Sequence, residues 1–562
     1  MLELDFINGW MNYKSPTNPA NDRNNICPAF WVDNIVYSLD REEVEDQLWV
    51  QVNDHGFRYL QFSLNFSDIV DHQQLPKILA KKGFLGFSNY EKAISNHLIN
   101  EQQRCVADGK IEYRHHRLGW YEYNGQNHFL MDSNFIAGTT STCERKNFKF
   151  YKGNREDYEN FLRNNVYPVP TLALAMAIGY SAPVVSLLRD EYDFGTIVYN
   201  LCGASSTGKS TVSQLLISPF ACPQITNQSG LIRTFSNTDN ALFSGLNDIH
   251  GLPIVLDDST TNTKIDYASL IYNLAQGENK GRCDSSGNLR EQGSGWSGVI
   301  VVSSETPIQS QSCHNQGLQA RVIGTEGITW TPDANTSNLI KKTIKKHYGW
   351  TGREFAEFVA SKPFSALCKH FDDALELVES MMVERDNLSD RLALKYATIP
   401  LTISLMNECF GLSLDSKDIT ALLLDSEQRS VLDRDIAVKA LECIKSFVVM
   451  KHRNFHMVHY YDNGRTCFRD SVADRYGKVS FRGKSCEIVI MSSKFNDVLK
   501  ASGINEPTTV KKRWKEQGLI KTDKDRYDIK VDGIRSICIV LPEGLPALEL
   551  IDTDKEGQSN ND

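Results

Sequence analysis

The clearest functional motif in this chain is the segment Gly203-Ala204-Ser205-Ser206-Thr207-Gly208-Lys209-Ser210, followed by Thr211. Its spacing is that of a phosphate-binding loop, G-x-x-x-x-G-K-[ST]. The glycines let backbone N–H groups approach phosphate oxygens, and the start of a helix favours an anion there. Lys209 can reach the β- and γ-phosphates, and the Ser210 hydroxyl can bind Mg²⁺. We therefore predict that residues 203–211 bind ATP, with Lys209 catalytic.

The residues on either side of this loop supply the setting that the motif requires. Residues 196–201 predict a buried strand, and residues 211–217 predict the start of a helix. Strand, glycine-rich loop and helix together form the phosphate-binding unit. The alternative, a chance match in a Gly/Ser-rich turn, does not account for the flanking strand and helix.

Two later apolar runs end in polar residues that suit nucleotide hydrolysis. The run 252–256 ends in Asp257 and Asp258, and the run 298–302 ends in Ser303 and Ser304. We predict that Asp257 binds Mg²⁺ and that Asp258 orients or activates the attacking water. Either serine can contact the γ-phosphate or the water, and we assign Ser304 to this role. The alternative is an ordinary strand end followed by a polar turn.

Arg321 immediately precedes a fourth apolar strand. In ring ATPases an arginine at this place reaches the γ-phosphate of the neighbouring subunit, because its planar, permanent charge stabilises charge spread over phosphate oxygens. We predict that Arg321 is catalytic, with a surface arginine as the alternative. Arg391 is a weaker candidate for a second phosphate sensor.

Two basic segments are candidates for DNA contacts. The first is a Gly/Asn-rich turn between the second and third apolar strands, which predicts a hairpin with Lys280, Arg282 and Arg290 facing a phosphodiester backbone. The second is the basic run Lys511-Lys512-Arg513 on a predicted helix, which can lie in a DNA groove. Solvated charges on a loop and on a protein-binding helix are the respective alternatives.

These motifs require an α/β fold, an ATPase core in which a parallel sheet carries helices on both faces. Helix, helix and hairpin over 492–541 predict a C-terminal winged helix, and strands with two helices predict a small α+β domain before the core. The predicted divisions are a flexible lead-in (1–26), an N-terminal α+β domain (27–155), the ATPase core with preceding helices (156–335), a helical lid and connecting helices (336–453), a winged-helix domain (454–545) and a disordered tail (546–562).

Composition limits the cellular setting and the manner of DNA binding. A formal net charge of −9 means that any DNA contact is made through local basic patches rather than the whole surface. The sequence has no run of about eighteen apolar residues, so we predict no contact with membranes. Thirteen scattered cysteines without a C-x-x-C pair predict reduced thiols in a cytoplasmic protein.

Taken together, these segments resemble the AAA+ helicases of mobile genetic elements, typified by the staphylococcal cassette chromosome helicases, which are similar to MCM replicative helicases. The likeness covers residues 28–400. The segments that carry it are Gly119-Trp120, the phosphate loop, Thr238-Asp239-Asn240, Leu256-Asp257-Asp258, Asn279-Lys280-Gly281-Arg282, Ser303-Ser304-Glu305, Arg321 and His347-Tyr348-Gly349.

The resemblance implies a homohexameric ring that hydrolyses ATP with Mg²⁺ at subunit interfaces and translocates on single-stranded DNA. It implies that Lys209, Ser210, Asp257 and Asp258 act within one subunit and Arg321 on its neighbour. The chain departs from the family at Asp258, where glutamate is common, and the shorter side chain has further to reach.

We therefore expect an ATP-dependent DNA helicase that serves replication of a mobile genetic element. Its partners would be single-stranded DNA in a central channel, duplex DNA at the winged helix, and further copies of the chain. An AAA+ ATPase that remodels a protein partner in regulation or defence is the main alternative. A monomeric P-loop kinase is a remote one and would leave Arg321 without a role.

The predicted channel hairpin can be tested directly. Lys280→Ala combined with Arg282→Ala should weaken single-stranded DNA binding about tenfold or more at low salt, because two phosphate contacts are lost. DNA-stimulated ATP hydrolysis should fall in parallel, while hydrolysis without DNA stays the same. Fluorescence anisotropy with a labelled oligonucleotide measures the binding, and unchanged affinity and stimulation would refute the channel role.

Overall fold

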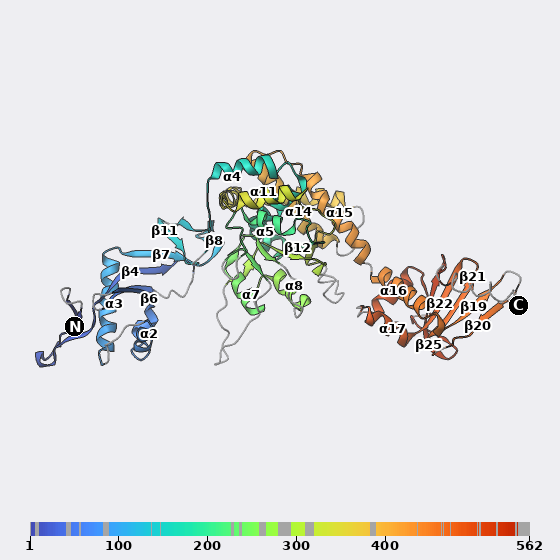
Figure 1. Cartoon of the computed structure of the whole chain (residues 1–562), viewed down its shortest axis with the longest axis horizontal. Helices are drawn as coiled ribbons and strands as arrows, with labels where there is room; N and C mark the ends of the chain where they lie inside the picture. The colour runs from blue at the N-terminus through green and yellow to red at the C-terminus, as the bar shows by residue number, and fades with distance from the viewer. Residues whose placement is uncertain are drawn as a thin grey trace.

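The computed structural model describes most of the chain. The described residues are 2–5, 10–40, 47–54, 58–82, 89–136, 138–145, 148–225, 230–234, 239–257, 266–278, 294–308, 320–382, 389–434, 436–461, 464, 466–472, 474–502, 504, 507–523, 526–545 and 548. Figure 1 shows three parts in a row, with a central body between smaller N-terminal and C-terminal parts.

The N-terminal part is built on two sheets. The first is β1 (Leu2–Asp5), β2 (Trp10–Tyr13) and β3 (Arg23–Pro28). The second has the order β10-β11-β7-β4-β5-β6, formed by β4 (Phe30–Ser38), β5 (Gln47–Asp54), β6 (Arg58–Asn65), β7 (Ile111–His115), β10 (Ser133–Ile136) and β11 (Thr139–Cys143). Three helices accompany them, α1 (Phe66–Val70), α2 (Leu75–Lys81) and α3 (Glu91–Ala107), and α3 packs on β4.

The prediction of a flexible lead-in over residues 1–26 was wrong. This segment forms strands β1, β2 and the start of β3, and the side chains of Leu2 and Met11 are buried in the N-terminal core. Its sparse apolar residues are separated by Asn and Pro, so no periodic pattern marks them as strands. The apolar contacts become visible only when the strands pair.

The central body is a parallel sheet of the order β13-β15-β17-β12-β18. Its strands are β12 (Ile197–Cys202), β13 (Ile232–Thr234), β15 (Ile254–Asp257), β17 (Val299–Ser304) and β18 (Val322–Gly324). Strand β12, which precedes the phosphate loop, is the first of the five along the chain. In the sheet it lies between β17 and β18, the fourth and the fifth. Strands β12, β15 and β17 are buried on both faces, as the continuous apolar runs predicted.

Helices pack around this sheet. Those before and within the core are α4 (Arg155–Phe161), the π-helix η2 (Leu162–Val166), α5 (Pro170–Tyr192), α6 (Lys209–Ile217), α7 (Asp239–Leu246) and α8 (Tyr267–Gln276). Those after it are α11 (Ala334–Ile344), α12 (Gly352–Ala360), α13 (Phe364–Met381), α14 (Ser389–Phe410) and α15 (Ser416–Arg434). Helix α6 packs on β13, β15 and β17, whereas α8 packs on β12 and α15 on β18. The predicted α/β core with a helical lid is confirmed (Figure 1).

Helix α5 shows how deeply the core is buried. Among the described residues it is the one helix with the length and apolarity of a membrane span, and 83% of its apolar window is buried inside the protein. It packs against α6 and α14. Its apolar character is therefore explained by its place in the core.

A small sheet joins the N-terminal part to the central body. Strands β8 (Leu118–Tyr123) and β9 (Gln126–Leu130) form the hairpin predicted around Asn124-Gly125, and β14 (Ile249–His250) and β16 (Trp296–Ser297) extend it in the order β16-β14-β8-β9. Trp120 packs in the central core and donates its indole N–H to the Pro183 carbonyl at 2.9 Å. The predicted domain boundary at residue 155 therefore cuts through this core.

The C-terminal part has its own hydrophobic core. It contains α16 (Ile436–Met450), α17 (Ser492–Ala501) and α18 (Pro507–Glu516), which accompany β19 (Phe455–Tyr460), β20 (Thr466–Arg469), β21 (Gly477–Arg482), β22 (Ser485–Met491), β23 (Ile520–Lys521), β24 (Ile529–Val531) and β25 (Ile534–Leu541). The predicted helix, helix and hairpin of the winged helix are α17, α18 and the β24–β25 pair, and Val510 and Trp514 of α18 are buried.

Two predicted limits of this part were wrong. Helix α16 was assigned to the connecting helices that end at residue 453, but its Ala437 lies in the C-terminal core and accepts a hydrogen bond from the Trp514 indole at 2.9 Å. The predicted disordered tail, 546–562, lies outside the described residues except for Leu548, whose side chain is buried in the same core. In both cases the local sequence does not show that the segment packs against the C-terminal core.

A substitution at Gly119 tests whether the close pairing of β8 with β14 in the joining sheet contributes to stability. Its φ is +87°, and a Cβ there would lie 1.6 Å from the carbonyl oxygen of His250 on the adjacent strand. We expect Gly119→Ala to lower the free energy of unfolding by about 3 kcal/mol, because the paired strands must separate.

Gly125 in the hairpin turn is the matched control. It also has positive φ, +74°, but a Cβ would meet no atom within 4 Å. Gly125→Ala should therefore cost only about 1 kcal/mol of backbone strain. Urea unfolding of both variants measures the difference, and equal losses would mean that the close strand contact does not matter.

Candidate active site

The phosphate loop connects β12 to α6 in the conformation that its glycines permit. Gly203 has a φ of +144°, Ser206 of +70° and Gly208 of +90°, and α6 begins at Lys209. A Cβ on Gly208 would lie 2.5 Å from the Thr331 hydroxyl oxygen, so the loop packs closely against the segment that leads into α11. The loop therefore turns tightly onto the start of a helix, where backbone N–H groups collect.

Lys209 is held over the loop. Its ammonium nitrogen donates to the carbonyl oxygens of Gly203 at 2.6 Å and Ala204 at 2.8 Å. The Thr207 hydroxyl donates to the Ala204 carbonyl, and the Thr207 carbonyl accepts from the backbone N–H of Trp330. These contacts keep a positive charge at the loop and leave it within reach of an anion that enters there.

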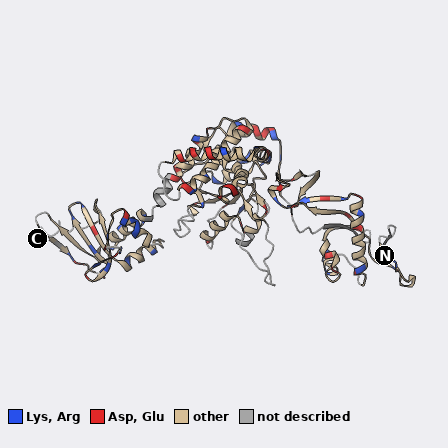
Figure 2. Ribbon diagram, turned by 180° about the vertical axis from the view of Figure 1, so that it is seen from behind, with Lys and Arg blue, Asp and Glu red and all other residues tan. Residues whose placement is uncertain are grey.

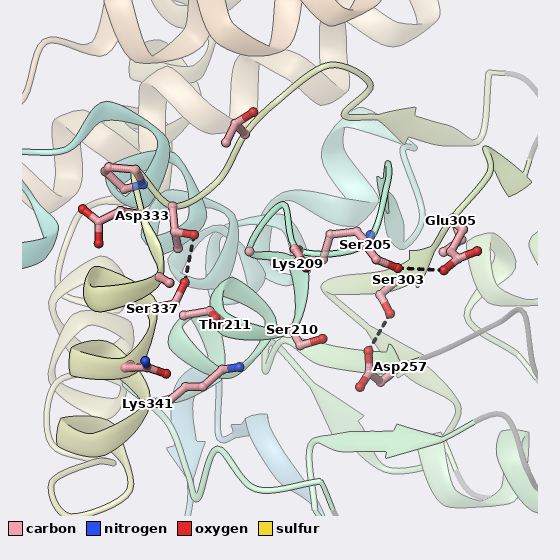
Figure 3. A pocket seen from close by; sticks show the side chains of 18 residues that line it. Ser205, Lys209, Ser210, Thr211, Asp257, Ser303, Glu305, Asp333, Ser337 and Lys341 are labelled. Atoms are coloured by element: carbon pink, nitrogen blue, oxygen red, sulfur yellow. Dashed lines mark hydrogen bonds between the residues drawn. The ribbon is translucent and has the colours of Figure 1, made fainter.

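Asp257 ends strand β15 beside the loop. Its side chain is buried, and the Ser303 hydroxyl donates to its Oδ1 at 2.5 Å. Figure 3 shows the Ser210 hydroxyl and the Asp257 carboxylate directed toward the same space. One carboxylate and one hydroxyl beside a phosphate site match the way Mg²⁺ is usually bound in proteins, with nucleotide phosphates and water as the remaining ligands. The donor set therefore fits a Mg²⁺–nucleotide complex.

The two serines at the end of β17 make different contacts. Ser303 contacts the Asp257 carboxylate, whereas the Ser304 hydroxyl accepts a hydrogen bond at 2.8 Å from the side-chain amide of Asn200 on β12. The Asn200 amide oxygen accepts from the backbone N–H of Ile308 at 3.0 Å. Asn200 thus orders the end of β17. The motifs in the sequence do not mark Asn200 as functional, and its one signal there is that it is a polar residue within the apolar strand 197–202.

The space between these groups is a cavity of about 660 Å³. Besides the loop, Asp257 and the serines, it is lined by residues that the sequence analysis gave no role. These are Glu305, Thr329, Thr331, Pro332, Asp333, Ala334, Ser337, Asn338 and Lys341. Glu305 accepts a hydrogen bond from the Ser205 hydroxyl at 3.0 Å, and Lys341 adds a positive charge from α11 (Figure 3).

Arg321 lies at the other end of the sheet. It immediately precedes β18, and its guanidinium carbon is 4.8 Å from the centre of the Tyr272 ring. Arg321 lines a second cavity of about 420 Å³, together with Arg391 and Lys395 of α14. The structure therefore does not bring Arg321 to the nucleotide cavity of its own chain.

Several predicted residues lie outside the described residues, namely Asp258, Lys280, Arg282 and Arg290. The ends of the segment that carries the three basic residues are held together, because the Trp296 N–H donates to the Gly277 carbonyl at 2.8 Å. Gly277 and Trp296, which flank this segment, therefore lie side by side.

The basic run on α18 divides between the interior and the surface. Lys511 is directed inward, with its ammonium 3.4 Å from an Asp528 carboxylate oxygen and its side chain 12% exposed. Lys512 is exposed and Arg513 half-buried. Figure 2 shows Lys and Arg gathered on a helix of the C-terminal part. The exposed basic residues of α18 are therefore Lys512 and Lys515, with the half-buried Arg513 beside them.

The strand order and the phosphate loop define a P-loop ATPase of the AAA+ class. Residues 9–294 match the family of the domain of unknown function DUF927, and residues 435–543 match the Cch helix-turn-helix domain. Because the first match spans half of the chain, the protein belongs to the DUF927 family.

Solved structures add the fold of the whole chain. The structure of the SCCmec type IV Cch active helicase is 21% identical, with a TM-score of 0.72 over 96% of this chain and 97% of that one. The apo A form of the NrS-1 C-terminal region is 12% identical, with a TM-score of 0.28 over 90% of this chain and 96% of that one. No curated protein matches the chain. The resemblance seen in the sequence is confirmed at the level of fold.

A substitution at Lys209 tests directly whether the cavity binds and hydrolyses a nucleotide. Lys209→Met keeps the side-chain length but removes the charge at the loop, so ATP hydrolysis should fall about a hundredfold or more. Lys345→Met removes an exposed lysine at the end of α11 and should leave the rate unchanged. Phosphate release measures both, and comparable hydrolysis by the two variants would contradict the assignment.

Proposed function

We propose that this protein is an ATP-dependent DNA helicase that works as a homohexameric ring on single-stranded DNA, in the replication of a mobile genetic element. The observation that carries the ring is the separation of Arg321 from the nucleotide cavity. The helicase assignment is supported by the fold shared with the SCCmec Cch helicase and by the Cch helix-turn-helix domain.

The separation follows from the register of two neighbouring strands. Val198 on β12 pairs with Val322 on β18, directly after Arg321, whereas the phosphate loop begins five residues further along at Gly203. At the rise of a parallel strand this places the two sites about 17 Å apart along the sheet. Arg321 can therefore contact only a nucleotide held by another subunit, and a ring provides that neighbour at every site.

Within one subunit, the backbone N–H groups of residues 203–210 and Lys209 would hold the phosphates. Ser210 and Asp257 would hold Mg²⁺, which neutralises charge on the phosphates during transfer to water. Ser303 orients the Asp257 carboxylate. Asp258 would position the attacking water, and Ser304 would contact the water or the γ-phosphate.

DNA contacts are proposed at two places. Lys280, Arg282 and Arg290 would meet the backbone of a single strand in the channel of the ring. Lys512 and Arg513 on α18 would contact duplex phosphates, while Lys511, which faces Asp528, would support the helix from inside. These are phosphate contacts, so they imply binding that weakens with salt rather than sequence-specific recognition.

Strand displacement from a forked DNA with ATP and Mg²⁺ tests this function. The wild-type protein should unwind the fork, and Lys209→Met should not, because unwinding requires hydrolysis at the cavity. ATP hydrolysis that continues without unwinding and without any response to DNA would refute the helicase. It would instead favour an ATPase that remodels a protein partner, which a chain with a net charge of −9 also allows.

A further inference from the structure

The second cavity has a strongly cationic lining. It lies where β12 and β18 begin, and its charged lining residues are Arg189, Asp190, Asp193, Arg321, Arg391 and Lys395. Four cations thus line the cavity with two carboxylates, Asp190 and Asp193, both of which are exposed, and Asp190 lies 3.9 Å from the Arg189 guanidinium. An excess of positive charge around this cavity of about 420 Å³ favours a bound anion, such as the terminal phosphates of a nucleotide.

Lys395 is the unusual member of this group. It lies on α14 one turn after Arg391, so both side chains lie on the same face of the helix. Lys395 is buried, and its ammonium donates to the carbonyl oxygen of Ala320 at 2.8 Å. A neutral carbonyl does not balance a buried ammonium, which costs free energy unless an opposite charge is supplied.

The contact that Lys395 makes bears directly on Arg321. Ala320 is itself buried, and it is the residue before Arg321. A hydrogen bond to this carbonyl holds the peptide unit from which the Arg321 side chain departs. Moving that peptide would move the guanidinium at the end of a long side chain.

We propose that Lys395 is a positioning residue for Arg321, and that the cavity they line receives the terminal phosphates of a nucleotide bound to a second copy of the chain. This inference rests on the proposed ring. It adds that the buried ammonium serves the neighbouring subunit's site and not its own.

The charge state of Lys395 agrees with this role. Burial, reinforced by the positive charges of Arg321 and Arg391, lowers the pKa of Lys395 to about 7. The isolated subunit therefore loses this proton as pH rises through 7, whereas an anionic phosphate in the cavity would favour the charged form. Contact between subunits should take up a proton, so wild-type hydrolysis should weaken at alkaline pH.

The folded subunit gains nothing from this charge. Because the pKa of Lys395 in the folded subunit is lower than in the unfolded chain, the unfolded chain holds the proton more tightly. The ammonium therefore costs stability at pH 7, and the cost is relieved as pH rises above 7. Lys395→Met should show a Tm no lower than that of the wild type, although its ATP hydrolysis falls about tenfold or more as Arg321 is displaced.

Mixing variants distinguishes a role in the neighbouring site from a role in its own. Lys395→Met keeps its own nucleotide cavity, and Lys209→Met keeps its own Lys395. In an equal mixture, about a quarter of the interfaces pair an intact cavity with an intact Lys395, so hydrolysis should recover to about a quarter of the wild-type rate. Lys417→Met, at an exposed lysine of α15, is the control and should match the wild type when assayed alone.

A parallel mixture of Arg321→Ala with Lys209→Met distinguishes a failure of the proposed ring from a failure of the proposed role of Lys395. If this mixture does not recover hydrolysis, the proposed ring arrangement fails. If it recovers and the Lys395→Met mixture does not, the ring stands and the role of Lys395 is overturned.

Lys395→Arg covers the case in which the methionine variant does not fold. It retains a permanent charge, so its hydrolysis should stay constant from pH 7 to about pH 9 while the wild-type rate falls. Identical pH profiles for the two proteins would overturn the proposal.

Discussion

The function of this protein depends on one constraint, the common direction of the five strands in the central sheet. Because β12, β15 and β17 run parallel, their carboxyl ends place the phosphate loop, Asp257 and Ser303 at one edge. The same direction places the start of β18, and with it Arg321, at the opposite edge. A single subunit thus carries the phosphate loop and Arg321 at opposite edges of one sheet. In the proposed ring, Arg321 of one subunit would complete the nucleotide site of its neighbour.

The joining sheet connects the N-terminal part to the residues that flank the proposed DNA hairpin. Strands β14 and β8 pair, and the residues that flank the hairpin segment are bound to the same region. The Asp248 carboxylate accepts hydrogen bonds from both the backbone N–H and the hydroxyl of Ser294, and His250 contacts the Ser294 and Ser297 hydroxyls. Burial lowers the pKa of His250 to about 4, so this network is neutral at the histidine near pH 7. These short contacts therefore connect the β8–β9 hairpin to the residues that flank segment 279–293.

The C-terminal part shows how one short helix serves packing and surface charge at once. Val510 and Trp514 are one turn apart on α18 and are fully buried, and the Trp514 indole is anchored to Ala437. The intervening basic residues are distributed around the remaining faces. Lys511 is partly covered by Asp528 and lies 5.4 Å from the centre of the Phe495 ring, whereas Lys512 is exposed. A run of like residues in the sequence is therefore not a uniform surface in the fold.

The sequence alone determined the phosphate loop, the apolar strands that end in Asp257 and Ser303, and the helices and hairpin of the winged helix, because each is a local pattern of residue types at fixed spacing. It did not reveal the strands within residues 1–26, the place of α16 in the C-terminal core, or the roles of Asn200 and Lys395. Those depend on which surfaces meet. Asn200 acquires its role because β17 lies beside β12, and Lys395 because α14 packs against the residue that precedes Arg321. Only the tertiary structure brings such distant positions together, since nothing in the local sequence records the partner that a side chain will find.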